Sequence, residues 1–135
     1  MLFRSEPDVE LTRIHFEKHA AHIRLDVIYR VSEFCEILNN TDHLASYDVW
    51  LLDYRLPQEN ALEILKKIRL SAYRKIPVIL VTGKGDEEIA VKALKLGAFD
   101  YVTKNQGYLF KLPSVIENAH YSRRLEREQI GRAHV

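Results

Sequence analysis

Two stretches of the chain are apolar without interruption, and both predict strands that are buried on both faces. Residues 49–52 (VWLL) lie within YDVWLLDYRLP at 47–57, and residues 76–81 (IPVILV) form the second stretch. A strand with one wet face alternates apolar and polar residues, whereas a strand of a parallel sheet with helices on both sides does not. Both stretches are therefore expected in the interior of a parallel sheet.

Three further apolar stretches predict the remaining strands. Residues 22–29 alternate apolar residues such as Ile23 and Leu25 with charged ones, which is the period-two pattern of an edge strand. Residues 98–103 predict a short strand, and residues 1–3 form an apolar stub at the start. Counted together, five strands are expected to alternate with helices along the chain.

Between these strands, the spacing of apolar residues and the end signals predict helices. The clearest is residues 60–70, where Ala61, Ile64, Leu65 and Ile68 recur at i, i+3, i+4 and i+7. The other expected helices are residues 7–18, a short helix capped by Ser32, a helix from its cap Asp86 to Gly97, and a final helix that begins at Pro113.

This alternation predicts an α/β fold with a doubly wound parallel sheet. In such sheets, ligands bind outside the carboxyl ends of the strands. Asp53, Thr82 and Lys104 lie at the ends of three successive predicted strands, so an acid, a hydroxyl and an amine are expected to face one crevice. Their joint placement favours a functional site over three unrelated turn residues.

Composition and net charge limit the classes of partner that the chain is expected to bind. The 135 residues are 47% hydrophobic, which suits one domain with a real core. Lysine and arginine number 20 against 19 acids, so the net charge predicts neither a nucleic-acid nor a membrane partner. Cys35 is the single cysteine, and no apolar run approaches the length of a spanning helix. A cytoplasmic location is expected.

Two motifs carry a resemblance to a known family. LLDYRLP, which contains Asp53, and PVILVTGKGDEEIAVKALKLGAFDYVTK, which ends on Lys104, resemble the receiver domain of two-component response regulators. The resemblance covers residues 1–121, and residues 122–135 are then expected to form a C-terminal helical extension or linker. It implies a flavodoxin-like fold with five parallel strands in the order 2-1-3-4-5 and helices on both faces.

The resemblance also implies roles for individual residues. Asp53 would be the phosphoacceptor, and Lys104 would contact the phosphoryl group. Thr82 would be the switch hydroxyl beside the Gly83 amide, and Tyr101 would be the aromatic switch residue. These residue types fit the chemistry, because a carboxylate can take a phosphoryl group while a hydroxyl, an amide and an ammonium stabilise its oxygens.

The expected Mg²⁺ site departs from the family pattern. Receivers carry two acidic residues after the first strand, and Arg4 and Ser5 occupy those positions here. Asp53 and the Arg55 backbone carbonyl remain as expected ligands, with Ser5 and Glu6 as further candidates. Because Mg²⁺ prefers carboxylate oxygens in octahedral geometry, weakened Mg²⁺ binding is expected.

The implied function is a phosphoacceptor module of a two-component phosphorelay. It would take a phosphoryl group from a histidine kinase or phosphotransfer protein and switch the face formed by helix four, strand five and helix five. No dedicated enzyme is expected, only catalysis of its own phosphorylation and dephosphorylation. A monomer or weak dimer is expected, with an output or sensory module possible on the same longer chain.

Two alternatives stay open. One is a pseudo-receiver, a protein-interaction module whose Mg²⁺ binding is weakened by Arg4 and Ser5. The other is a small flavodoxin-like enzyme or nucleotide binder, although Gly83 and Gly85 lack the remaining residues of a phosphate-binding loop. Modification of Asp53 by an acyl phosphate donor would discriminate among these functions.

Overall fold

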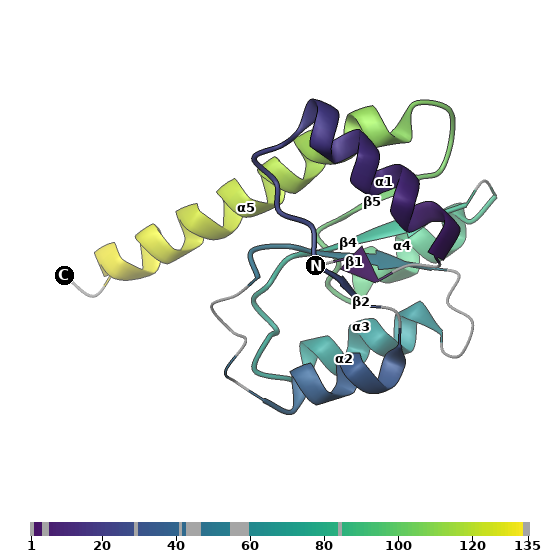
Figure 1. Cartoon of the computed structure of the whole chain (residues 1–135). Helices are drawn as coiled ribbons and strands as arrows, with labels where there is room; N and C mark the ends of the chain where they lie inside the picture. Colours follow the sequence, from purple (N-terminus) through teal and green to yellow (C-terminus); the bar gives the residue numbers. More distant parts are fainter. Residues whose placement is uncertain are drawn as a thin grey trace.

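The computed structural model describes residues 2–3, 6–28, 30–40, 42, 47–54, 60–83 and 85–133, with side chains for all of these except 2–3, 6–9 and 127–133. Its helices and strands, labelled in Figure 1, are β1 (Leu2–Phe3), α1 (Glu6–His19), β2 (Val27–Ile28), α2 (Val31–Leu38), β3 (Trp50–Asp53), α3 (Ala61–Arg69), β4 (Val78–Thr82), α4 (Glu87–Lys95), β5 (Asp100–Thr103) and α5 (Tyr108–Ala133). Among the described residues, no helix is long and apolar enough to cross a membrane.

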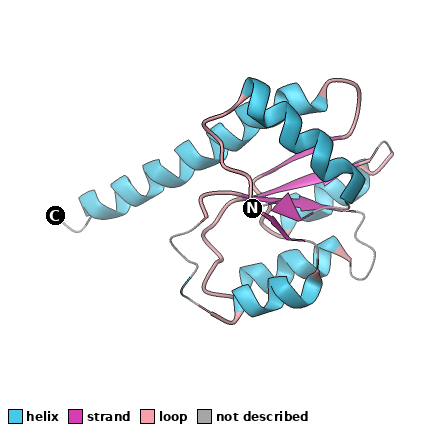
Figure 2. Ribbon diagram, in the orientation of Figure 1, coloured by secondary structure: helices cyan, strands magenta, loops and turns pink. Residues whose placement is uncertain are grey.

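The strands of the described chain form one sheet in the order β2-β1-β3-β4-β5, and every neighbouring pair is parallel. Helices connect successive strands and cover the sheet from both sides (Figure 2). The predicted α/β class, with a parallel sheet between helices, is therefore confirmed. All described strands point their carboxyl ends to the same edge, which is where β3 delivers Asp53.

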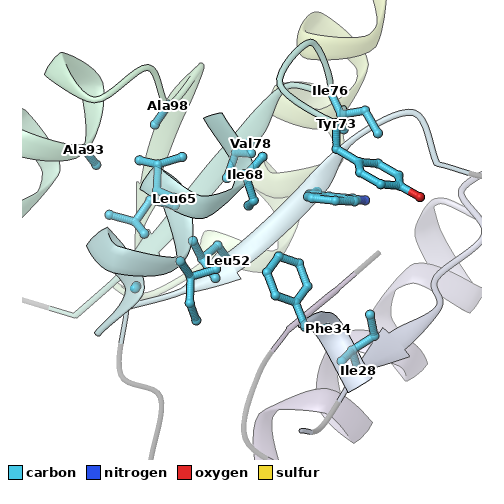
Figure 3. Close-up of a cluster of buried hydrophobic side chains, with 14 of the residues drawn as sticks. Ile28, Phe34, Leu52, Leu65, Ile68, Tyr73, Ile76, Val78, Ala93 and Ala98 are labelled. Carbon is cyan, nitrogen blue, oxygen red and sulfur yellow. The ribbon is translucent and has the colours of Figure 1, made fainter. Parts of the chain in front are cut away.

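One hydrophobic cluster lies between the sheet and the helices α2, α3 and α4. Trp50 and Leu52 of β3 contribute to it from the sheet. Figure 3 shows Phe34, Tyr73 and other residues of this cluster packed together. The ring of Trp50 stacks on Tyr73 with centroids 5.2 Å apart and meets Phe34 edge-on at 5.5 Å. These aromatic contacts fix the face of β3 that is turned toward α2 and α3.

The opposite face of the sheet packs against α1 and α5. Its buried cluster contains Phe16 of α1, the sheet residues Val49, Leu51, Ile79 and Val102, and Leu112, Val115, Ile116 and Ala119 of α5. Successive residues from 49 to 52 therefore alternate between the two clusters. This is why the stretch VWLL has no polar member.

The predicted edge strand at 22–29 is much shorter in the structure. Only Val27 and Ile28 pair with the sheet, and their partners are Leu2 and Phe3 of β1. A strand persists only where a neighbour supplies hydrogen bonds, and the described β1 supplies two residues. Residues 22–26 consequently run as turn and loop despite their alternating pattern.

The predicted cap of the second helix is wrong. α2 begins at Val31, the N-cap position is held by Arg30, and no side chain makes a capping hydrogen bond there. Ser32 lies inside the helix. The buried residues Phe34 and Ile37 hold this short helix on the core, so packing takes the place of the cap.

The predicted start of the last helix is also wrong. α5 begins at Tyr108 and carries Pro113 in its interior, although proline cannot donate a helical hydrogen bond. Leu112 precedes the proline and is completely buried against the sheet, which holds the first turns of the helix in place. α5 then runs without interruption through the predicted domain boundary at residues 121 and 122 (Figure 1).

The fold makes a direct stability prediction in α3. Leu65 is fully buried, whereas Leu70 at the end of the same helix is 90% exposed. Leu65→Ala should lower the free energy of unfolding by about 2–5 kcal/mol, because it leaves a cavity in a packed core. Leu70→Ala should change it by less than about 0.5 kcal/mol. Denaturant titration of both variants measures the difference, and equal losses would contradict the assignment of this core.

Candidate functional site

Three of the predicted site residues meet at the carboxyl edge of the sheet. Asp53 ends β3, Thr82 ends β4, and Lys104 directly follows β5. The backbone amide of Lys104 donates to the carbonyl of Thr82 over 2.7 Å, so the residue after β5 is tied to the end of β4. The parallel register thus brings together groups that are far apart in the sequence.

Asp53 and Lys104 form the centre of this site. The ammonium of Lys104 donates to Asp53 Oδ2 at 3.0 Å, and the Asp53 side chain is 2% exposed while that of Lys104 is 23% exposed. Burial of a carboxylate is costly unless a partner offsets the lost hydration. Lys104 supplies such a partner, and its own side chain stays partly open to solvent. The site therefore combines a nucleophilic oxygen with an adjacent positive charge.

The alternation along the strands separates the site residues into two groups. Leu51 and Val102 face the α1 and α5 side, so the residues two positions later, Asp53 and Lys104, belong to that side of the sheet. Leu80 faces the side covered by α2, α3 and α4. The buried Thr82 lies two residues later in β4 and therefore belongs to the same side. Thr82 therefore lies beside the Asp53–Lys104 pair but on the α4 side of the strand ends.

Tyr101 lies on the same side as Thr82. It is half-buried and packs against the cluster that also contains Leu80, its partner in the parallel register. Its backbone amide donates to Asp100 Oδ1 at 2.7 Å. The predicted switch hydroxyl and switch aromatic residue are thus on one face of the sheet, two residues apart in register.

The Gly83 amide is already engaged. It donates to Asp86 Oδ2 at 3.2 Å, while the Asp86 amide donates to the Gly83 carbonyl at 3.4 Å. Asp86 holds the N-cap position of α4 as predicted, but its side chain makes no capping bond to the helix. This contact of Asp86 with the Gly83 amide was not predicted from the sequence. The only available signal was a short polar side chain three residues after a glycine, a spacing that suits a local turn.

The described residues do not by themselves make a metal site. They contain no group of three His, Cys, Asp or Glu side chains arranged to hold an ion. Arg4, Ser5 and Arg55 lie outside the described residues, and so does the side chain of Glu6. The predicted departure in the Mg²⁺ site therefore stays a prediction from the sequence.

Two side chains with displaced pKa values lie away from this edge. Burial lowers the pKa of His15 on α1, and the nearby His19 lowers it further. Burial raises the pKa of Tyr47, and the charges of Asp26 and Glu33 add to the increase. Tyr47 precedes β3, at the opposite edge of the sheet from Asp53. Neither shift therefore concerns the carboxyl ends of the strands.

The fold and the motifs are those of a known protein family. A family model described as the response regulator receiver domain matches residues 9–110. The chain belongs to this family. As a receiver domain it is a module of two-component signal transduction, and it shares the family's flavodoxin-like α/β fold.

Curated relatives of this receiver domain are longer regulators. The chain is 45% identical over 58 residues to the cyclic di-GMP phosphodiesterase response regulator RpfG of Xanthomonas campestris pv. campestris (strain 8004), a match covering 42% of this chain and 15% of that protein. It is 30% identical over 89 residues to the transcriptional regulatory protein CpxR of Klebsiella pneumoniae subsp. pneumoniae (strain HS11286), covering 64% and 38% respectively. The receiver domain thus spans well under half of these relatives.

Solved structures show the same fold. A response regulator receiver domain protein from Clostridium thermocellum is 27% identical with a TM-score of 0.75, and the match covers 92% of this chain and 94% of that one. The receiver domain of NtrX from Brucella abortus has a TM-score of 0.73 at 21% identity, with coverage of 89% and 96%. Receiver domains generally bind Mg²⁺ and interact with histidine kinases or phosphotransfer proteins.

Proposed function

We propose that this receiver domain accepts a phosphoryl group on Asp53 from a histidine kinase or phosphotransfer protein. The observation that carries the proposal is the buried Asp53 carboxylate with the Lys104 ammonium at 3.0 Å. A carboxylate oxygen of Asp53 would attack phosphorus, and the bond from phosphorus to the donor imidazole nitrogen would break. The product on this chain would be an acyl phosphate, and the released imidazole would take up a proton from solvent.

Lys104 would stabilise the charge on the transferred group. Phosphoryl transfer places negative charge on three equatorial oxygens, and catalysis consists mainly of positioning and electrostatic stabilisation. The Lys104 ammonium is already held beside the attacking carboxylate, so it needs little rearrangement. The Gly83 amide could serve as a further donor once it exchanges the Asp86 carboxylate for a phosphoryl oxygen.

The first test is chemical modification. Incubation with a small acyl phosphate and Mg²⁺ should add one phosphoryl group at Asp53, and Asp53→Asn should abolish the addition. Lys104→Met should slow it by about 10²-fold, the usual effect of removing one preorganised charge-stabilising group. Lys95→Met, at an exposed position in the last turn of α4, is the matched control and should leave the rate unchanged. Intact-protein mass spectrometry measures all four chains, and modification of Asp53→Asn would contradict the proposal.

The metal would be bound by Asp53 together with the Arg55 carbonyl, and Ser5 and Glu6 are the remaining candidates near the end of β1. Bound Mg²⁺ would supply positive charge for the phosphoryl oxygens. Arg4 cannot coordinate a cation and adds a like charge, so it should weaken the site. The comparisons favour a receiver, and no finding favours the pseudo-receiver alternative with its weakened metal site.

A charge-matched pair of variants tests this metal prediction. Arg4→Asp with Ser5→Asp should bind Mg²⁺ at least tenfold more tightly than the parent chain, because it supplies two carboxylates. Arg13→Asp with Ser32→Asp makes the same change in net charge on α1 and α2 and should not tighten binding. Isothermal titration calorimetry measures both affinities. If the parent already binds as tightly as the first variant, Arg4 does not oppose the metal and Glu6 becomes the candidate ligand.

The output of the switch is proposed to be the face formed by α4, β5 and α5. Thr82 and Tyr101 share one side of the sheet with α4, so a movement of the Thr82 hydroxyl toward a phosphoryl group would change the room available to Tyr101. Around them, Val91, Leu94 and Phe99 are exposed apolar residues, between 38% and 50% exposed. They give this face the chemistry of a protein-docking surface.

Nuclear magnetic resonance can follow this switch directly. Phosphorylation at Asp53 should shift the amide signals of Tyr101 and of residues 90–96. Thr82→Ala should remain able to take the phosphoryl group but should lose most of the shifts, because the hydroxyl that couples the site to Tyr101 is gone. Shifts confined to the residues adjoining Asp53 in the phosphorylated parent chain would contradict the proposed output face.

The site would act as one part of a larger regulator. The relatives that the receiver domain matches are longer proteins, and their names describe transcriptional regulators and a phosphodiesterase response regulator. We extend the proposal to an output or sensory module connected to this domain. α5 supplies a physical route, since its 26 residues span about 39 Å and its yellow end projects beyond the sheet (Figure 1).

A further inference from the structure

A stretch of the chain that includes most of α3 is rich in basic residues and contains no acid. From residue 64 to residue 85 the sequence has six lysines and arginines and no aspartate or glutamate. The chain as a whole has a formal net charge of only +1, so the rest of the chain is net negative. A local excess of one sign can attract a charged partner even where the total charge is close to zero.

The fold adds two lysines of α4 to this stretch. Helices that connect parallel strands run back across the sheet, so α3 and α4 both end at its amino edge, opposite the edge that carries Asp53. The two helix ends are in contact. A Cβ atom at Gly97, just after α4, would lie 2.6 Å from Nε of Arg69, the last residue of α3. Lys92 and Lys95 lie in the last turn of α4. The basic residues of both helices therefore contribute to one surface.

This surface, which we call the basic edge, consists of Arg69, Arg74, Lys75, Lys92 and Lys95. All five residues are exposed. The acids of the two helices lie elsewhere: Glu63 pairs with Lys66 over 3.2 Å, and Glu87 and Glu88 occupy the first turn of α4, at its other end. The basic edge thus keeps its positive character despite the acids of α3 and α4.

Helix dipoles explain only part of this pattern. The negative pole at the carboxyl end of a helix favours nearby cations, which suits Arg69, Lys92 and Lys95. Arg74 and Lys75 follow α3 and belong to its connection with β4, so a dipole does not account for them. This edge therefore carries more positive charge than the stability of its helices explains.

An exposed leucine lies among these cations. Leu70 directly follows Arg69 at the end of α3 and is 90% exposed. The loop that begins there is closed by its own hydrogen bonds, since Arg69 Nη1 donates to the carbonyl of Arg74 over 3.1 Å and Ser71 Oγ donates to the carbonyl of Ile68 over 2.7 Å. The loop is thus held in place and leaves Leu70 in solvent.

We propose that the basic edge binds the surface of a membrane that contains anionic lipids, with Leu70 entering the region between headgroups and acyl chains. The negative potential of such a surface attracts cationic side chains, and each one strengthens binding by about fivefold. An apolar side chain that enters the interface adds a second contribution to the attraction between charges. This inference is independent of the proposed phosphorylation of Asp53.

Two residues favour a lipid surface over nucleic acid and over an acidic protein. Contacts with nucleic-acid phosphates come from charged and polar side chains, so they give the isolated Leu70 no role. Arginine recognises a protein carboxylate best through paired hydrogen bonds, and the guanidinium of Arg69 already donates to the Arg74 carbonyl. A lipid surface needs no such geometry, because it offers diffuse negative charge above an apolar layer.

Vesicle binding by the whole chain tests the proposal. Phosphatidylcholine vesicles with about 30% phosphatidylserine provide the anionic surface, and pure phosphatidylcholine vesicles provide the neutral one. The basic-edge variant is Lys75→Glu with Lys95→Glu. Its control is Lys18→Glu with Lys111→Glu, which makes the same change in net charge at exposed positions of α1 and α5. Leu70→Ala removes the apolar contact and leaves the charge unchanged. Co-sedimentation measures the partition coefficient of each chain.

The parent chain should bind the anionic vesicles and not the neutral ones, and added salt should weaken the binding. The basic-edge variant should bind at least tenfold less tightly, because two attractive charges become repulsive. Its control should lose much less, and Leu70→Ala should bind severalfold less tightly than the parent.

Three results would overturn the proposal. The first is a parent chain that does not bind the anionic vesicles, or that binds both kinds equally. The second is an equal loss in the two charge variants, because total charge would then account for the binding. The third is binding to a DNA duplex or to polyglutamate without binding to vesicles, which would make the basic edge a surface for nucleic acid or protein.

Discussion

β3 is buried on both of its faces, and the arrangement of the site depends on this constraint. Trp50 and Leu52 belong to the cluster under α2, α3 and α4, while Val49 and Leu51 belong to the cluster under α1 and α5. A shift of β3 by one residue would exchange these two sets and place every side chain on the wrong face. The register that satisfies both cores also determines that Asp53 is the residue at the carboxyl edge. The core therefore positions the carboxylate that we propose as the phosphoacceptor.

The charge of Lys104 offsets the cost of burying the Asp53 carboxylate and also suits the proposed chemistry. A carboxylate that is 2% exposed needs compensation, and the Lys104 ammonium at 3.0 Å provides part of it. The same pair suits phosphoryl transfer, because a positive charge held next to the acceptor stabilises the incoming oxygens without reorganisation. A structural requirement and a chemical one are met by one contact. The Asp86 carboxylate accepts a hydrogen bond from the Gly83 amide. A phosphoryl oxygen could accept the same hydrogen bond in its place.

The strand pairs of the sheet differ in the number of residues that they pair. β4 pairs over four residues with β3 and over four residues with β5, which holds Asp53 and Thr82 in register. The described part of β1 pairs over two residues with each neighbour. β1 lies between β2 and β3 in the sheet. The strands that carry the candidate site residues are thus paired over more residues than the described part of β1.

Much of this arrangement was determined by the sequence alone. Uninterrupted apolar runs at 49–52 and 76–81 require two covered faces, so they specify a parallel sheet between helices and place Asp53 and Thr82 at strand ends. Tertiary structure determined the bounds of some elements and the contacts within the site, which local sequence patterns could not predict. The alternation at 22–29 formed a strand only where β1 offered partners, and α5 passed through Pro113 because Leu112 is buried upstream of it. The strand register also determines the 3.0 Å contact between Asp53 and Lys104. It likewise determines the side of the sheet on which Thr82 lies. Hydrogen bonds between strands and burial between helices join residues far apart in the chain, and no local window of sequence contains both partners.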